Sequence, residues 1–328
     1  MAKTDLYPFL FKTIYKEKIW GGDKIKSHLE KDFGALPNCG ETWEISTVPG
    51  DVSEVANGAL EGTSLKELIN IYKDELVGKK NYEEYKDDFP LLIKFIDAND
   101  DLSVQVHPDD DLATTRHGSR GKTEMWYIIQ ADEEASLITG FNREMNRELY
   151  QEYDSKNQIS ELLNREVVNK GDVFYIPAGR IHTIGKGILL AEIQQSSDVT
   201  YRIYDFDRKD SQGNYRELHN DLALDALDYT FHKEYRNTYV DDHNKCNNLV
   251  TSTYFKTNKF TITESIERDY STLDSFIIYI CIEGEALIQY SDNQEINIKK
   301  GEVYLLPAIY KNTTIKPLVE SIFLEVST

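Results

Sequence analysis

The sequence is poor in sulfur-containing residues and has no long apolar run. Its 328 residues include only 3 cysteines and 3 methionines. The cysteines Cys39, Cys246 and Cys281 are odd in number and widely spaced, which fits reduced thiols better than a disulfide framework. No stretch approaches the roughly 18 apolar residues of a membrane span, and the N-terminus shows no signal-peptide pattern. We therefore expect a cytoplasmic protein without membrane partners.

Positive charge is also scarce. Lysine and arginine number 37 against 57 aspartates and glutamates, so the formal net charge is −20. Such a field repels nucleic acid phosphates and anionic membranes, and an anionic ligand must be bound by locally placed cations. Hydrophobic residues make up 40% and aromatic residues 11% of the chain, enough for a folded core. We expect a globular monomer or homodimer that binds a small molecule and no nucleic acid.

Short apolar or alternating runs separated by turn residues predict a mainly β protein. The clearest predicted strands are 91–97, 102–107, 125–130, 172–176, 188–194 and 199–204. This spacing is typical of a sandwich or barrel.

Three inserted segments have helical periodicity, at about 64–88, 143–164 and 218–230. The first begins with a capping box formed by Ser64 and Glu67. Behind it, one predicted helix face is apolar and consists of Leu65, Leu68, Ile69 and Tyr72. The acidic run 109–111 is suited to cap another short helix.

An internal repeat indicates a duplicated β unit. The segment 170–178, KGDVFYIPA, recurs as KGEVYLLPA at 300–308, an offset of 130 residues. Similar strand pairs precede the two copies, at 126–138 and 277–288. In the second copy Asn312 stands where the first has His182, so we expect the second unit to lack a metal.

Four residues outline a metal site. Gln105 and His107 lie two apart on a predicted strand and share a face, and Glu124 and His182 can join them from neighbouring strands. Two imidazoles, one carboxylate and one amide oxygen suit Zn²⁺ or another borderline divalent ion and leave positions open for a substrate. Two histidines with one carboxylate are also the ligands of non-haem Fe(II) oxygenases, which is a second hypothesis.

The turn, apolar strand, Pro-Ala-Gly and histidine at 171–182 resemble the second motif of the cupin barrels. Longer segments resemble type I mannose-6-phosphate isomerases in their short bacterial form. They are Trp20–Gly22, Gly40–Ser46, Pro90–Lys94, Leu102–Pro108, Gly121–Tyr127, Pro177–His182 and Ser197–Asp205. In order and spacing the resemblance extends from about residue 7 to 210, with the degenerate cupin after 240 also expected of the family.

The resemblance implies two cupin-type β-barrels of jelly-roll form with a few inserted helices. Residues 1–235 would form the catalytic domain, which carries the three helical insertions, and 240–328 a degenerate cupin without metal ligands. The implied cofactor is one Zn²⁺ per chain, bound by Gln105, His107, Glu124 and His182. Gln105 remains open as a hydrogen-bond partner of a ligand, because a neutral amide is a weak ligand.

Three residues are candidates for the chemistry. Arg202 stands where the family has its active-site arginine, on a strand whose apolar residues face the other way; its permanent charge suits it to stabilise an anion. Lys122 lies two residues before Glu124, where a nearby dication favours the neutral amine that a base requires. Asp198 matches a family aspartate beside the substrate. Besides proton transfer, Lys122 could bind the phosphate or a sugar hydroxyl, and Asp198 could orient Arg202 or a ligand histidine.

The predicted activity is the interconversion of mannose 6-phosphate and fructose 6-phosphate through a cis-enediol. The alternatives are the Fe(II) oxygenase and a sugar-phosphate-binding cupin without turnover, since fold similarity alone does not establish activity. Trp20, Trp43 and Glu44 come from motifs that lie near the site in the family. Arg116 and Arg120 are candidates for binding a phosphate group at the rim.

Overall fold

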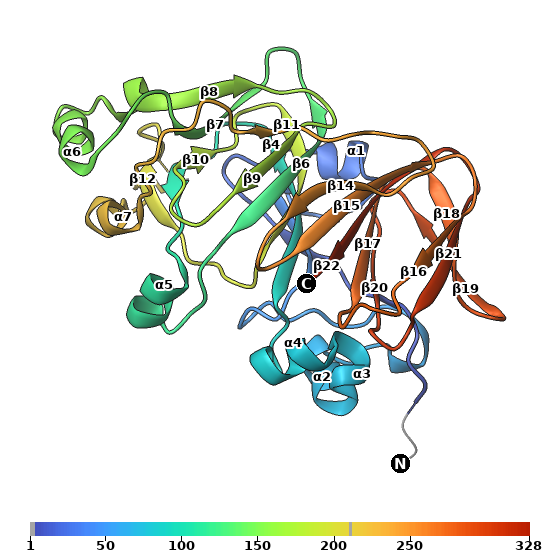
Figure 1. Ribbon diagram of the computed structural model, residues 1–328. Coiled ribbons are helices and arrows are strands. Elements are labelled where there is room, and N and C mark those ends of the chain that lie inside the picture. The colour runs from blue at the N-terminus through green and yellow to red at the C-terminus, as the bar shows by residue number, and fades with distance from the viewer. Residues whose placement is uncertain (1–3, 210–211) are drawn as a thin grey trace.

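The computed structural model describes residues 4–209 and 212–328. The chain forms four antiparallel sheets, two in each half, with short helices inserted in the first half (Figure 1). The prediction of a mainly β protein is confirmed. Each half is a pair of facing sheets of jelly-roll type without closure into one continuous barrel. Within 4–209 and 212–328, none of the helices is both long and apolar enough to cross a bilayer.

The first half contains a seven-stranded and a five-stranded sheet. The larger sheet has the order β13 (Arg236–Asn237), β9 (Val173–Ile176), β6 (Glu124–Ala131), β11 (Ile188–Gln195), β4 (Leu91–Ala98), β3 (Glu41–Ile45), β2 (Ile14–Lys16). The smaller has the order β12 (Tyr201–Tyr204), β5 (Val104–Val106), β10 (His182–Thr183), β7 (Ser136–Phe141), β8 (Leu163–Val167).

The second half contains a six-stranded and a four-stranded sheet, coloured orange to red in Figure 1 apart from β1. The larger has the order β1 (Phe9–Leu10), β20 (Val303–Leu306), β17 (Ile277–Glu283), β22 (Ser321–Ser327), β15 (Lys256–Ile262), β14 (Asn247–Thr251). The smaller has the order β16 (Ile266–Asp269), β21 (Asn312–Pro317), β18 (Glu285–Ser291), β19 (Gln294–Lys299).

The two larger sheets pack against each other and share one core. Ile93, Tyr127 and Ile193 of the first half lie in the same buried cluster as Leu305 and Val326 of the second. Strand β1, from the N-terminal segment, pairs with β20 of the second half. The division of the chain near 235–240 stays a prediction, and the shared core indicates that the halves fold together.

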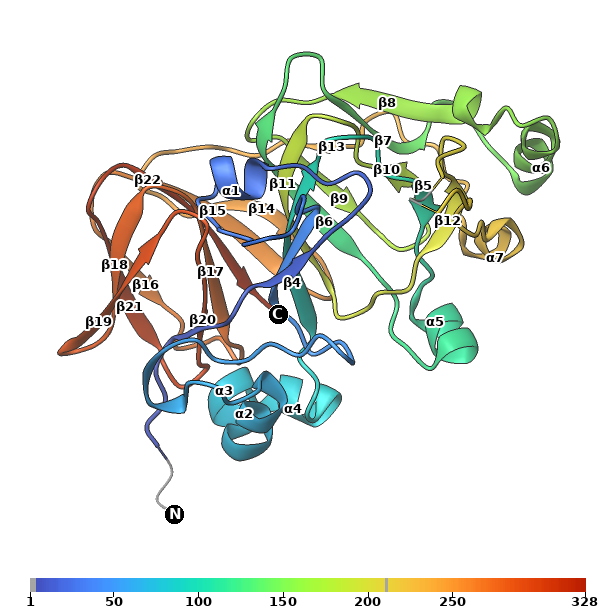
Figure 2. The same ribbon diagram turned by 180° about the vertical axis from the view of Figure 1, so that it is seen from behind.

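The predicted insertions are helical. Their helices are α2 (Leu65–Tyr72), α3 (Asp74–Val77), α4 (Lys79–Tyr85), α6 (Arg147–Ser155) with the 3-10 turn η2 (Ile159–Leu162), and α7 (Asn220–Ala226). Figure 2 shows α2, α3 and α4 grouped at one end of the sheets. The capping box at Ser64 is formed as predicted, and the four predicted apolar residues of α2 are its buried residues.

Three elements outside those insertions complete the fold. Asp109 caps α5 (Asp110–His117), because its carboxylate accepts the N–H of Leu112 at 2.9 Å. The helix expected after the acidic run is therefore present. Helix α1 (Lys24–Ser27) and the 3-10 turn η1 (Gly58–Leu60) are too short to show a sequence period.

Candidate metal centre and active-site cavity

Three polar side chains meet between the two sheets of the first half. Glu124 begins β6, His182 begins β10 and His107 follows β5, and all three are almost fully buried. One ligand atom from each lies within 4.8 Å of the others. Nε2 of His107 is 3.5 Å from Oε2 of Glu124, and Nε2 of His182 is 3.4 Å from Oε1.

Burial keeps both imidazoles neutral. It lowers the pKa of His182 to about 4, and it lowers the pKa of His107 well below the ordinary value. Burial, with the nearby Glu192 carboxylate, raises the pKa of Glu124 to about 8 against the opposing charges of Lys122 and Lys94. The contacts between histidine and carboxyl are therefore not ordinary ion pairs.

The donor set fits a divalent cation. Nδ1–H of His107 donates to the carbonyl of Val199 at 2.9 Å, and Nδ1–H of His182 donates to that of Arg180 at 2.8 Å, so each Nε2 lone pair faces the cluster. Among the described residues, His107 Nε2 and both Glu124 oxygens have no hydrogen-bond partner, a costly state for buried acceptors.

The spacing of these atoms supports the same conclusion. Neighbouring ligands of a tetrahedral ion bound at about 2.1 Å are about 3.4 Å apart. The 3.4 Å and 3.5 Å separations are close to that value, but they involve different oxygens of Glu124. One ligand atom from each of the three side chains lies within 4.8 Å of the others, which is close enough for them to hold one divalent cation.

Gln105 lies at the same point. Its amide nitrogen is 3.2 Å from Nε2 of His182, and its residue pairs with His182 across β5 and β10. Rotating the amide by half a turn would exchange its nitrogen for Oε1, and an amide oxygen can bind a divalent ion. The structure thus brings all four predicted ligands together.

A cavity of about 290 Å³ opens beside the cluster. It is lined by Lys18, Trp20, Glu41, Lys94, Ile96, Leu102, Ser103, Gln105, Lys122, Ile184, Glu192, Asp198, Thr200, Arg202 and Arg216. All three residues predicted for the chemistry therefore lie at one cavity, together with one of the predicted ligands.

The three predicted chemical residues occupy different depths. Lys122 is buried, with Nζ 3.6 Å from Oε2 of Glu124. Arg202 pairs with Gln105 across β12 and β5, while Tyr201 and Ile203 pack on the opposite face of the strand. Asp198 is exposed at the cavity wall. Lys122 is thus beside the metal cluster, and Asp198 meets solvent.

A buried charge pair in the cavity wall escaped the sequence analysis. Nζ of Lys94 on β4 lies 3.3 Å from Oε1 of Glu192 on β11, and Nε1 of Trp126 donates to Oε2 of Glu192 at 2.9 Å. Burial raises the pKa of Glu41, but Lys94 and Lys18 together lower it to about 2. The sequence does carry a signal for this pair: Lys94 is the single lysine in a mostly apolar predicted strand, and a buried lysine needs a partner.

Of the three residues expected near the site, the two tryptophans lie at or beside the cavity and Glu44 does not. Trp20 lines the cavity, and Trp43 lies against Lys94, whose Nζ is 5.1 Å from the ring centroid. Glu44 points elsewhere and pairs with Lys31 at 3.1 Å. Strand alternation explains this, because residue 44 faces away from residues 41 and 43.

The two rim arginines do not line the cavity. Arg116 pairs with Asp225, and the Arg120 guanidinium stacks 4.2 Å from the ring centroid of Tyr85. These contacts do not test whether the two arginines bind a phosphate group at the rim, so that expectation stays a prediction. Arg116 lies in α5 and Arg120 in the loop that follows it.

Strand registers show what the second half carries at the equivalent positions. Glu124 pairs with Ile176 in the first half. The repeat relates Ile176 to Leu306, and Leu306 pairs with Ile277 in the second half. His182 pairs with Gln105, as Asn312 pairs with Asp269. The positions of Glu124, His182 and Gln105 are thus held by Ile277, Asn312 and Asp269.

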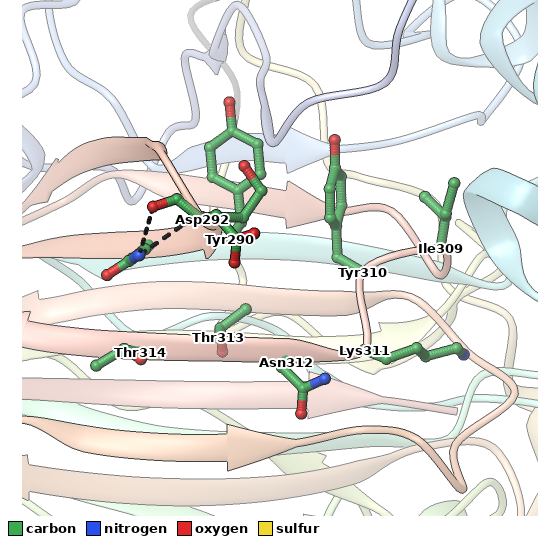
Figure 3. Close-up of a pocket in the computed structure, with 10 residues that line it drawn as sticks. Tyr290, Asp292, Ile309, Tyr310, Lys311, Asn312, Thr313 and Thr314 are labelled. Atoms are coloured by element: carbon green, nitrogen blue, oxygen red, sulfur yellow. Dashed lines mark hydrogen bonds between the residues drawn. The ribbon is translucent and has the colours of Figure 1, made fainter.

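A different cavity, of about 390 Å³, lies on the second half between β18 and β21 (Figure 3). Its lining includes Tyr290, Tyr310 and Asn312 and contains no histidine, cysteine or glutamate. It therefore lacks the imidazole and carboxylate combination found in the first half.

Facing antiparallel sheets around a buried cluster of two histidines and one carboxylate define a candidate metalloprotein of jelly-roll fold. The model "Phosphomannose isomerase type I, catalytic domain" matches residues 9–149, and "Mannose-6-phosphate isomerase, cupin domain" matches residues 245–324. The chain belongs to the type I phosphomannose isomerase family, and the predicted resemblance is confirmed.

Individual relatives agree. The chain is 38% identical over 309 residues to mannose-6-phosphate isomerase ManA of Bacillus subtilis (strain 168), covering 92% of this chain and 93% of the relative. It is also 38% identical over 309 residues to mannose-6-phosphate isomerase of Streptococcus mutans, covering 93% and 94%.

Solved structures match over the whole length. The crystal structure of mannose 6-phosphate isomerase from Bacillus subtilis superposes with a TM-score of 0.87 at 35% identity, covering 98% of this chain and 99% of that one. A mutant phosphomannose isomerase from Salmonella typhimurium gives a TM-score of 0.81 at 15% identity, covering 97% and 98%, and so shares the fold.

Proposed function

We propose that this chain interconverts D-mannose 6-phosphate and D-fructose 6-phosphate, with one Zn²⁺ held by His107, Glu124, His182 and Gln105. The observation that carries the proposal is the buried His107–Glu124–His182 cluster, in which His107 Nε2 and both Glu124 oxygens lack a hydrogen-bond partner among the described residues, at a cavity rich in cationic side chains. Membership of a metal-dependent isomerase family supports it. A cytoplasmic location and a monomeric or homodimeric state stay predictions.

The reaction needs two proton movements. The aldose loses a proton from C2 and gains one at O1 to give a cis-enediol, which then loses a proton from O2 and gains one at C1. When bound, the metal would polarise the substrate oxygens as a Lewis acid. The protein must supply a group that carries protons and a cation that balances the developing negative charge.

We assign proton transfer to Lys122, because it is the buried basic side chain beside the metal cluster. Arg202 would balance charge on the enediolate, since its guanidinium stays protonated and lies across from Gln105. Asp198 is the alternative proton carrier, and it lies at the exposed part of the cavity wall.

A coupled assay of fructose 6-phosphate formation from mannose 6-phosphate tests the proposal. Turnover should vanish on chelation and return with Zn²⁺. Arg202→Ala should lose most turnover and keep its metal. A folded, fully metallated protein without turnover would overturn the isomerase proposal, and consumption of oxygen with bound iron would then favour the oxygenase.

A further inference from the structure

We propose that Arg216, fixed by Asp205, binds the phosphate group of the substrate at the outer end of the cavity, beside Arg202. This inference rests on the proposed function and specifies how the sugar phosphate is oriented. The reacting carbons would face His107, Glu124, His182 and Arg202, and the phosphate would face Arg216. The sequence analysis gave Arg216 no part in the site.

The cations deep in the cavity are already matched by carboxylates. Lys94 lies 3.3 Å from Glu192, Lys18 lies 3.1 Å from Glu41, and Lys122 lies 3.6 Å from Glu124. An entering phosphate dianion would have to compete with these carboxylates and would be repelled by them. The deep end therefore suits the neutral carbonyl and hydroxyl end of the substrate.

Arg202 offers an unmatched cation. Its Nη1 donates to the carbonyl of Glu217 at 2.8 Å, and its buried Nε has no hydrogen-bond partner among the described residues. It forms no side-chain ion pair within that part of the chain. A buried guanidinium donor without an acceptor is costly, and an enediolate oxygen of the substrate would relieve that cost, so a second cation is needed for the phosphate.

Arg216 is held in place with part of its guanidinium still available. Its Nε donates to Oδ2 of Asp205 at 2.7 Å, and its Nη2 donates to Oδ1 of the same carboxylate. Asp205 is buried and also binds Arg208 at 2.6 Å. This one carboxylate is therefore shared by two guanidinium groups, whereas each lysine deep in the cavity has a carboxylate of its own. One edge of Arg216 is thus anchored, and no residue within 4–209 and 212–328 accepts a hydrogen bond from Nη1, so this atom can meet an anion in the geometry that suits phosphate.

The chain path explains why these arginines meet. β12 is the edge strand of its sheet, and the described part of the segment after it folds back so that Lys209 bridges Tyr215 (Figures 1 and 2). Arg216 then returns to Asp205 at the end of β12. The like charges of Arg216 and Arg208 lie close enough to help burial lower the pKa of Arg202, a repulsion that an anion would remove.

The position of Arg216 agrees with the length of a hexose phosphate. Arg202 is next to Gln105 and so near the metal cluster, whereas Arg216 also lines an outer cavity of about 220 Å³ with Tyr204, Arg208 and Tyr215. The C1–C2 bond and the 6-phosphate lie at opposite ends of the substrate. A phosphate at Arg216 therefore lets the reacting end reach the cluster.

The test compares Arg216→Gln and Arg216→Lys with the wild-type holoenzyme. Readouts are KM and kcat for mannose 6-phosphate, the dissociation constant of inorganic phosphate from calorimetry, and bound metal. For Arg216→Gln we expect KM and the phosphate dissociation constant to rise about tenfold or more, with a smaller fall in kcat and unchanged metal. Arg216→Lys should recover part of the loss, because it restores charge without the fork.

Arg147→Gln is the matched control, since Arg147 also pairs with a carboxylate, at 3.0 Å from Asp225, but lies outside the cavity. It should leave all readouts unchanged. Unchanged KM and phosphate binding in a folded Arg216→Gln protein would overturn the inference. Absence of wild-type turnover would instead overturn the proposed function, and the phosphate titration, which needs no turnover, would still decide the part of Arg216.

Discussion

Lys94 and Glu192 face each other across β4 and β11, with Nζ and Oε1 3.3 Å apart and both side chains almost fully buried. The pair connects the wall of the cavity to Trp126, whose indole N–H binds the second oxygen of Glu192. In the second half, Asn258 and Glu325 hold the same register and are joined at 2.9 Å. A buried polar pair at this position is thus common to both halves; in the second half Asn258 replaces the lysine and Glu325 takes its cation from Arg268, at 3.0 Å.

Lys94→Met should destabilise the protein by about 3–5 kcal/mol, because it leaves the Glu192 carboxylate buried without its cation. The double variant Lys94→Met with Glu192→Met should recover much of this loss, since neither charge is then stranded. Urea denaturation followed by circular dichroism measures both. Lys79→Met is the control: its pair with Glu83 is exposed, and a change below about 1 kcal/mol is expected.

Glu124→Gln should abolish stoichiometric metal binding and lower isomerase activity at least about 100-fold, because it removes the one anionic ligand of the cluster. Metal content by mass spectrometry and the coupled assay measure the two effects. His243→Asn, an exposed histidine, should change neither. Full metal content with full activity in Glu124→Gln would remove this cluster from the function.

Lys122→Met should keep its metal and lose about 10²- to 10⁴-fold in kcat, the range for loss of a general acid–base group. Asp198→Asn should lose less, because Asp198 is exposed and Lys122 is buried beside Glu124. Steady-state kinetics and exchange of the C2 proton with deuterium, followed by NMR, measure the effects. The opposite ranking would assign proton transfer to Asp198.

The metal-free protein should lose the stabilising contribution of His182 in acid. Burial lowers the pKa of His182 from 6.5 to about 4, so between these values the unfolded chain binds more protons than the native state. The contribution is complete above about pH 6.5 and is lost as the pH falls through about 4. The stability difference between metal-free wild type and His182→Asn should therefore shrink by about 2–3 kcal/mol on acidification.

Urea denaturation of the chelated proteins between pH 7.5 and 4.5 checks this. Glu124 titrates in the opposite sense, because its pKa is raised to about 8, and it is present in both proteins. The comparison thus cancels the part of the Glu124 titration that both proteins share, and the remaining difference comes from the imidazole together with its 3.4 Å contact to Glu124. A stability difference that does not vary with pH would show that His182 is protonated to the same extent in the native and unfolded states.

The sequence alone indicated the central strands of the first half, the three helical insertions and the residues proposed as metal ligands. Period-2 alternation gave the strands and the cavity-facing position of Arg202, and the Ser64–Glu67 spacing gave the start of α2. These are local features, because strand geometry and helix capping depend on residues a few positions apart. The repeat likewise indicated a second unit in which Asn312 replaces His182.

Only the tertiary structure decided which distant residues share the cavity. Lys94 meets Glu192 because two strands nearly a hundred residues apart pair in one register, and Arg216 meets Asp205 because the segment after β12 folds back. Arg116 and Arg120, close to Lys122 in sequence, instead contact Asp225 and Tyr85. Register and loop path follow from packing of the whole chain, so no local pattern carries them.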